Sequence, residues 1–207
     1  MIKHHPSETT LLTYATGALV VAHAQVVAVH VASCPHCVQQ LQVLVAVGGA
    51  LLEELPPAPL ASDVLSRTMA RLDGPPPVAP ASIRSDTNSA LQSLAMGRWR
   101  WCGPGIQMMK LARRDASGTR LDLIRVAPGV ALLEHGHTGF ETTAVLQGAF
   151  DDGVDHYHQG DFAEADGTLD HQPKALAGPE CICLIATSGR LSPRGLLGRL
   201  VRPLLGM

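Results

Sequence analysis

The sequence has no surplus of positive charge, which limits the class of partner it can bind. Its 207 residues include 16 Lys and Arg and 18 Asp and Glu, for a formal net charge of -2. Such a chain has no basic excess with which to neutralise phosphates, so we expect no direct binding to nucleic acid. The length suits one large domain or two small ones, and a hydrophobic content of 46% is ample for their cores.

Cysteine is scarce, and its number is odd. The chain has five cysteines, and no second Cys-x-x-Cys accompanies the one formed by Cys34 and Cys37. This count does not fit the disulfide framework of a small secreted protein. A reducing cytoplasm is therefore the simpler setting for the chain.

Membrane signals are weak in this sequence. No stretch reaches the roughly 18 uncharged apolar residues that a spanning helix needs. The apolar run over residues 11–22 ends in a small-x-small triplet that resembles a signal-peptidase site. However, the preceding MIKHHPSETT has one Lys and one Glu instead of a basic region. We expect a cytoplasmic protein with no membrane partner.

The N-terminal third has the periodicity of helices. Apolar residues recur at steps of three or four, which predicts an amphipathic helix over residues 7–30 with Ser7 as its N-cap. A second periodic stretch runs from about residue 38 to Glu54, where a proline cluster stops it. These two segments predict a helical hairpin with the cysteine pair at its turn.

A third, shorter helix is expected over residues 62–72. It places three apolar side chains on one side, and we expect them to contact a partner: Leu65, Met69 and Leu72. The proline-rich sequence that follows is typical of an interdomain linker. The predicted organisation has three parts: a zinc-binding helical domain (1–73), a linker (74–90) and a metal-binding sensor domain (91–207).

Beyond about residue 95 the pattern changes to short β-prone runs separated by turn residues. Examples are TRLDLIRV, TTAVLQGAF and CICLIAT. Their length and spacing predict an antiparallel sandwich or barrel, and hence an α+β chain of two domains. The chain ends in LSPRGLLGRLVRPLLGM, which we expect to pack its leucines on the barrel. The alternative for this segment is an interfacial helix.

The segment HVASCPHC raises a choice between redox chemistry and metal binding. A thioredoxin-like redox site needs a buried strand before the first cysteine, whereas the preceding segment is predicted to be helical. His30, Cys34 and Cys37 are spaced by four and three residues, so they converge on one side of a helical turn. A structural zinc needs a fourth ligand, and His5 is a better candidate than His4 because rigid Pro6 follows it. Two buried, reduced cysteines remain the simplest alternative.

A second constellation lies in GVALLEHGHTGFETTAVLQG, which has the spacing of the first cupin motif. Two histidines two residues apart on a strand face the same way, and a glutamate beyond the turn can return to that face. The second cupin motif starts at Gly160 and supplies a histidine eleven residues later. The expected ligands of zinc or another divalent metal are His135, His137, Glu141 and His171. Asp166 stands where the motif usually has proline.

Cys181 and Cys183 alternate on one predicted strand and face the same side. Cysteines in such positions are most often small core residues. They are also candidate redox residues if they lie near the cupin metal.

The segments HHPS, HVASCPHC, EHGHTGFETTAVLQGAF and GDFAEADGTLDHQP, in this order, resemble the ChrR family of zinc-binding anti-sigma factors along nearly the whole chain. The resemblance implies a cytoplasmic regulator and not an enzyme. Its helical domain would sequester an extracytoplasmic-function sigma factor in a 1:1 complex. Its cupin domain would be needed for release under singlet oxygen or related oxidants.

Three other functions stay open at this point. The first is a periplasmic oxidoreductase built on CPHC. The second is a cupin metalloenzyme of the dioxygenase or isomerase type with a zinc-helical appendage. The third is a zinc-dependent interaction module with a partner other than a sigma factor. A sigma factor copurifying with nearly two metals per protein would separate the anti-sigma function from these three.

Overall fold

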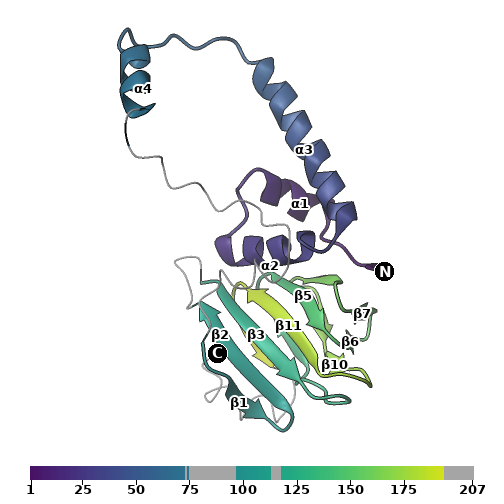
Figure 1. Cartoon of the computed structure of the whole chain (residues 1–207). Coiled ribbons are helices and arrows are strands. Elements are labelled where there is room, and N and C mark those ends of the chain that lie inside the picture. The colour runs from purple at the N-terminus through teal and green to yellow at the C-terminus, as the bar shows by residue number, and fades with distance from the viewer. Residues whose placement is uncertain (73, 75–96, 113–117, 194–207) are drawn as a thin grey trace.

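The chain forms a helical part and a β-barrel, in agreement with the α+β class expected from the sequence (Figure 1). This computed structural model describes residues 1–72, 74, 97–112 and 118–193. The expected linker and the Leu/Arg-rich segment after residue 193 lie largely outside the described residues. The helices are α1 (Glu8–Ala15), α2 (Val21–Val31), α3 (Pro35–Glu53) and α4 (Val64–Leu72).

The single helix predicted over residues 7–30 is wrong, because the chain forms two helices there. Ser7 is the N-cap of α1, as expected, and its side chain accepts a hydrogen bond from the amide of Thr10. Helix α1 ends before Gly17, whose φ of +70° is a left-handed conformation typical of helix C-termini. The continuous apolar stripe did not reveal this break. As a result α2 turns away and lies across the barrel (Figure 1).

Helices α3 and α4 confirm the second and third predicted helices. In α3 only Cys37 and Leu41 are buried, and α4 buries no residue. Helix α3 is long and apolar enough to cross a membrane by length and composition alone, so the expectation that no stretch would reach that threshold is wrong. One such helix is weak support for a membrane span. The two helices project away from the barrel (Figure 1).

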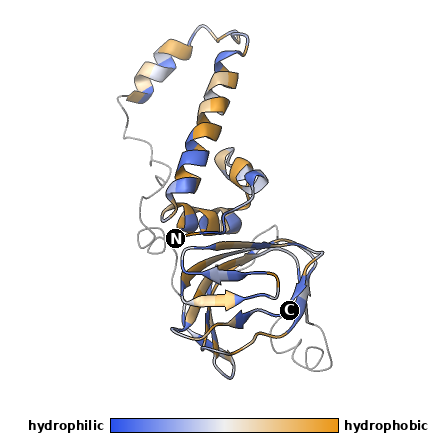
Figure 2. Ribbon diagram, turned by 90° about the vertical axis from the view of Figure 1, so that its right-hand side faces the viewer, coloured by the Kyte–Doolittle hydropathy of each residue, from blue (hydrophilic) through white to orange (hydrophobic). Residues whose placement is uncertain are grey.

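The barrel is built from antiparallel strands in three sheets (Figure 2). A six-stranded sheet has the order β1-β2-β3-β11-β5-β8, and the two three-stranded sheets have the orders β10-β6-β7 and β12-β4-β9. The strands are β1 (Arg100–Gly103), β2 (Ile106–Ala112), β3 (Arg120–Val126), β4 (His135–His137), β5 (Glu141–Gln147), β6 (Ala149–Asp151), β7 (His156–His158), β8 (Phe162–Ala165), β9 (Asp170–His171), β10 (Lys174–Ala175), β11 (Cys181–Thr187) and β12 (Leu191–Pro193). The runs noted in the sequence from residue 106 onward correspond to these strands.

Both faces of the six-stranded sheet are buried. On one face, Leu121 and Leu184 belong to the same core cluster as Val26 and Val27 of α2. On the other face, Ile124 belongs to a second cluster inside the barrel. Burial on both faces explains why every residue of β3 is buried or half-buried, although its sequence RLDLIRV includes three charged residues. The first core therefore joins the helical part to the barrel.

Candidate metal centres

The first centre gathers four donor groups at the junction of α2 and α3. His30 lies near the end of α2, Cys34 is the N-cap residue of α3, and Cys37 lies in its first turn. His5 comes from the segment before α1. All four donor atoms lie within 4.8 Å of one another. His5, and not His4, joins this cluster, as the sequence predicted.

The distances in this cluster suit a tetrahedral zinc ion. His30 Nε2 lies 3.3 Å from Cys37 Sγ, and His5 Nδ1 lies 3.3 Å from Cys34 Sγ and 3.5 Å from Cys37 Sγ. Zinc bonds of about 2.0 Å to nitrogen and 2.3 Å to sulfur in a tetrahedron separate these atoms by about 3.6 Å. The donors therefore need to move little to hold the ion.

Electrostatics in the cluster disfavour a free redox thiolate. Burial raises the pKa of the Cys37 thiol to about 12, and the neighbouring Cys34 adds to this effect. Burial also lowers the pKa of His30 to about 4, so its imidazole stays neutral and can act as a ligand. A reactive thiol needs a lowered pKa, and a thioredoxin-like site needs a strand before its first cysteine. Here α2 precedes Cys34.

The second centre lies in the barrel, where three strands bring the expected cupin residues together. His135 and His137 lie on β4, Glu141 starts β5 and His171 ends β9. His171 Nε2 lies 3.0 Å from His137 Nε2 and 3.2 Å from His135 Nε2. Neutral imidazole nitrogens converging so closely favour a shared cation, and this spacing suits bonds of about 2.1 Å to one metal. The four donors lie within 4.8 Å of one another.

Neighbouring groups orient the donors of this second cluster. His135 Nδ1 donates to the carbonyl of Leu133 at 2.7 Å, which leaves Nε2 available to a metal. Thr187 donates to Glu141 at 3.0 Å. Asp166, which replaces the usual proline, accepts hydrogen bonds from the amide and hydroxyl of Thr168 at 2.9 and 2.6 Å. A turn stabilised by these aspartate hydrogen bonds therefore precedes His171, where the motif usually has a proline turn.

Metal binding at the second cluster should release a proton in slightly acidic solution. Burial raises the pKa of Glu141 to about 7, and burial lowers that of His137 and His171 to about 4. Near about pH 6 the metal-free protein then carries neutral imidazoles at His137 and His171 and a protonated Glu141, which must lose its proton on binding. We expect release of about one proton there and almost none above about pH 8, so affinity rises with pH through about 7.

Calorimetry in two buffers of different ionisation enthalpy would measure this proton. The titration should use the Cys34→Ser, Cys37→Ser protein, in which thiols of the first cluster contribute none. A Glu141→Gln variant is the control, since its amide has no proton to lose. Equal proton release near about pH 6 and about pH 8 would contradict the assignment of this proton to Glu141.

A small cavity of about 50 Å³ adjoins the second cluster inside the barrel. Glu141 and His171 line it, together with apolar side chains and the two cysteines of β11. Cys181 Sγ and Cys183 Sγ are 3.6 Å apart. The hydrogen bond with Cys181 and burial raise the pKa of Cys183. Both cysteines are buried core residues that also lie beside the cluster, as the sequence allowed.

Two buried polar residues were missed by the sequence analysis. His23 is 2% exposed, and its ring nitrogens lie 2.9 Å from Thr142 Oγ1 and 2.8 Å from Ser188 Oγ. Asp161 is 1% exposed and accepts backbone hydrogen bonds. One signal for His23 was available, because it lies two helical turns before His30 and so on the same face of α2.

Comparison with known proteins yields a family model for the C-terminal half and matches over nearly the whole chain. The family model described as "ChrR Cupin-like domain" matches residues 87–189. The chain is 38% identical to "Anti-sigma-E factor ChrR" of Cereibacter sphaeroides over 212 residues, covering 98% of this chain and 97% of that protein. A crystal structure of Rhodobacter sphaeroides SigE in complex with the anti-sigma ChrR is similar with a TM-score of 0.76 and 39% identity. That match covers 91% of this chain and 100% of the other.

Proposed function

The chain belongs to the ChrR family of anti-sigma factors, and from this membership we propose that it binds an extracytoplasmic-function sigma factor in a 1:1 complex. It is a regulator and not an enzyme. The complex would form in the cytoplasm, where it withholds the sigma factor from RNA polymerase. The related ChrR structure was solved in complex with SigE, which supports a partner of the same class here.

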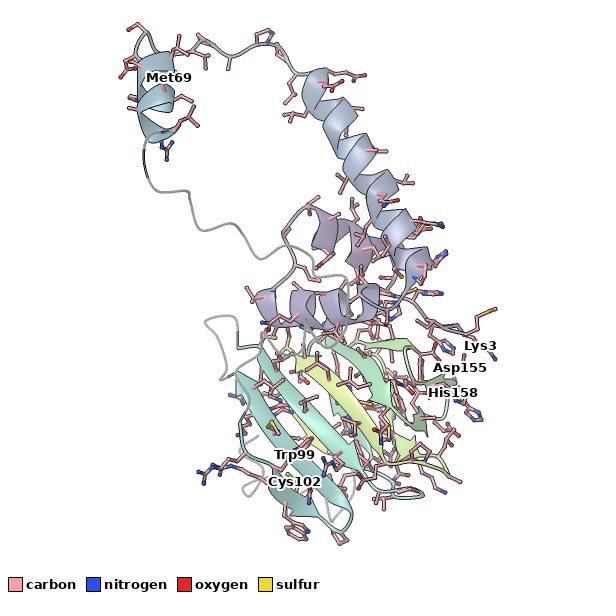
Figure 3. All side chains as sticks on the ribbon, viewed as in Figure 1. Lys3, Met69, Trp99, Cys102, Asp155 and His158 are labelled. Carbon is pink, nitrogen blue, oxygen red and sulfur yellow. The ribbon has the colours of Figure 1, made fainter. Side chains whose placement is uncertain are left out.

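The observation that carries this proposal is the apolar surface of α3 and α4. Exposed large apolar side chains lie on these two helices and the turn after α3: Val38, Val43, Val45, Val47, Leu51, Leu52, Leu55, Leu65, Met69 and Leu72. Monomeric proteins rarely leave so many together in contact with water, and such surfaces mark sites of protein binding. Met69 lies on α4, away from the barrel (Figure 3).

We propose that the two metal centres have different tasks. His5, His30, Cys34 and Cys37 would hold a structural zinc that fixes α3 relative to α2. The cupin cluster would hold zinc or another divalent metal and serve as the sensor that loosens the complex under singlet oxygen or related oxidants. Cys181 and Cys183 beside it are candidate redox residues. The proposed boundaries remain 1–73, 74–90 and 91–207, and α2 of the first part packs on the barrel of the third.

Changing the apolar side of α4 tests where the partner docks. We expect Leu65→Asp with Met69→Asp to weaken sigma-factor binding by about tenfold to thirtyfold, since buried apolar anchors carry most of the energy of an interface. Both residues are exposed, so the free protein should keep its stability. The chain would be co-expressed with the adjacent gene product, the copurified complex analysed for metal, and binding measured by calorimetry.

Val154→Asp on the barrel is the matched control, because Val154 is 72% exposed and Leu65 is 73% exposed. It should bind like the unmodified chain. Unchanged affinity of the α4 variant would show that α4 is not part of the docking surface. Failure of any sigma factor to copurify would reject the proposed function as a whole.

A further inference from the structure

We propose that the barrel positions two of the four ligands of the N-terminal zinc site, through its β7–β8 turn (158–161) and the start of β8, and so sets how firmly the helices hold their zinc. This inference rests on the proposed zinc site but not on the identity of the partner. The part of the chain that holds zinc would then include a turn of the barrel as well as the helices. Lys3, Asp155 and His158, which surround this junction, lie close together on one side of the barrel (Figure 3).

The first contact fixes His30. Its Nδ1 lies 2.9 Å from the carbonyl oxygen of Gly160, to which it can only donate a hydrogen bond. The proton is therefore on Nδ1, and the lone pair of Nε2 points at the cluster, where Cys37 Sγ lies 3.3 Å away. The Phe162 ring packs against the imidazole at a centroid distance of 5.4 Å. A ligand oriented in this way needs no rearrangement to bind zinc.

The second contact fixes the segment that carries His5. The buried carboxylate of Asp161 accepts hydrogen bonds from the amides of Lys3 at 2.7 Å and His4 at 3.1 Å. The amide of Phe162 donates to the carbonyl of His4 at 3.1 Å. The segment before α1 therefore lies along the edge of β8, and His5 is the next residue in the chain.

Asp161 is well placed to control this segment because both of its oxygens are used. Its second oxygen accepts from the amide of His158 at 2.8 Å and lies 3.3 Å from His4 Nδ1. At Gly160 a β-carbon would lie 2.9 Å from Ile2 Cγ1, so only glycine allows the segment to approach this closely. An asparagine at position 161 would point an NH2 group at one of these N–H donors, leaving it without an acceptor.

The same stretch of chain leads to the other metal cluster. Gly160 and Asp161 open the second cupin motif, and His171 at its end belongs to the cupin cluster. Strand β8 between them pairs with β5, whose first residue is Glu141. One strand and its flanking turns thus contact ligands of both clusters. A change in the barrel can reach the zinc site by this path without any contact to the sigma factor.

Cobalt substitution of the full chain gives a direct test. Absorption from sulfur-to-cobalt charge transfer reports only the N-terminal cluster, since the cupin cluster has no cysteine donors. We expect Asp161→Asn to speed loss of this band in excess EDTA by about tenfold to a hundredfold, the usual effect of removing a group that orients a ligand. Glu180→Gln, at an exposed carboxylate on the barrel outside both clusters, should change it by less than about twofold.

Equal release rates in Asp161→Asn and the unmodified chain would overturn the inference while leaving the zinc site intact. Absence of the sulfur–cobalt band in the unmodified chain would overturn the zinc site itself.

A second measurement does not depend on folding of the variant. Removing metal from the unmodified chain should accelerate amide hydrogen exchange in peptides covering residues 1–7 and 156–163, and not in 118–126. Unchanged exchange in the first two peptides would also overturn the inference.

Discussion

Replacing Cys34 and Cys37 together with serine is expected to abolish zinc retention at the N-terminal cluster and to weaken sigma-factor binding by at least about a hundredfold. Serine hydroxyls do not ionise near neutral pH and are poor zinc ligands, so only two imidazoles would remain. Structural zinc contributes about 10–16 kcal/mol to the folding of small domains. Helix α3 has little else to hold it, because only Cys37 and Leu41 are buried along its length.

Metal analysis and calorimetry on the same preparation would measure both losses. Cys102→Ser is the control, because Cys102 lies on the barrel far from the helices (Figure 3) and belongs to neither cluster. It should retain about two metals per chain and bind normally. A double variant that loses zinc yet binds with full affinity would separate the metal from the function. One that keeps both would reject the ligand assignment.

The members of the two clusters could be predicted because their spacing is local. His30, Cys34 and Cys37 follow one another at helical steps, so any helix–turn–helix brings them together. The cupin residues follow a motif of fixed spacing, in which β-strand alternation sets the facing of His135 and His137. Membership of His5 in the cluster was harder to predict, since it depends on how the segment before α1 folds back toward the cysteines. It was chosen for the rigidity of Pro6, and the structure places it in the cluster.

The relation between the two parts of the chain could not be predicted in this way. Periodicity showed that α2 has an apolar face, but it does not say what covers that face. The predicted helical domain would cover it with its own helices, whereas the structure uses the outer face of the six-stranded sheet. The break at Gly17 was missed because the apolar stripe continues through it. The contacts of His23 in the barrel, and those of Asp161 with the N-terminal segment, join residues more than 100 positions apart.

These long-range contacts suggest how the cupin cluster reaches the helices. Glu141 accepts from Thr187, and the residues that follow each of them, Thr142 and Ser188, both contact His23 of α2. His23 lies seven residues before His30, on the same helix. Loss or oxidation of the metal site could displace Glu141 and so shift α2 at His23. Because α2 is one helix, the same shift would reach His30, the candidate zinc ligand near its other end.

His135→Ala and Glu141→Ala should each leave sigma-factor affinity within about twofold of the unmodified chain and slow release under singlet oxygen by up to about a hundredfold, the upper range of coupling between two sites. Affinity should be preserved because the proposed docking surface on α3 and α4 is separate from the cupin cluster. Release should be slower because a metal site that lacks one of its ligands would no longer undergo the oxidative change that loosens the complex. Fluorescence of a labelled sigma factor under illumination with a photosensitiser would follow release.

His156→Ala is the control for this experiment, because His156 is an exposed histidine on β7 outside both clusters. Like His135→Ala, this variant removes one oxidisable imidazole, but it leaves the candidate metal ligands unchanged. Normal release in all three variants would mean that the barrel is not the sensor and that oxidants act on the zinc thiolates directly. Blunted release in the cupin variants but not in His156→Ala would assign sensing to the metal cluster.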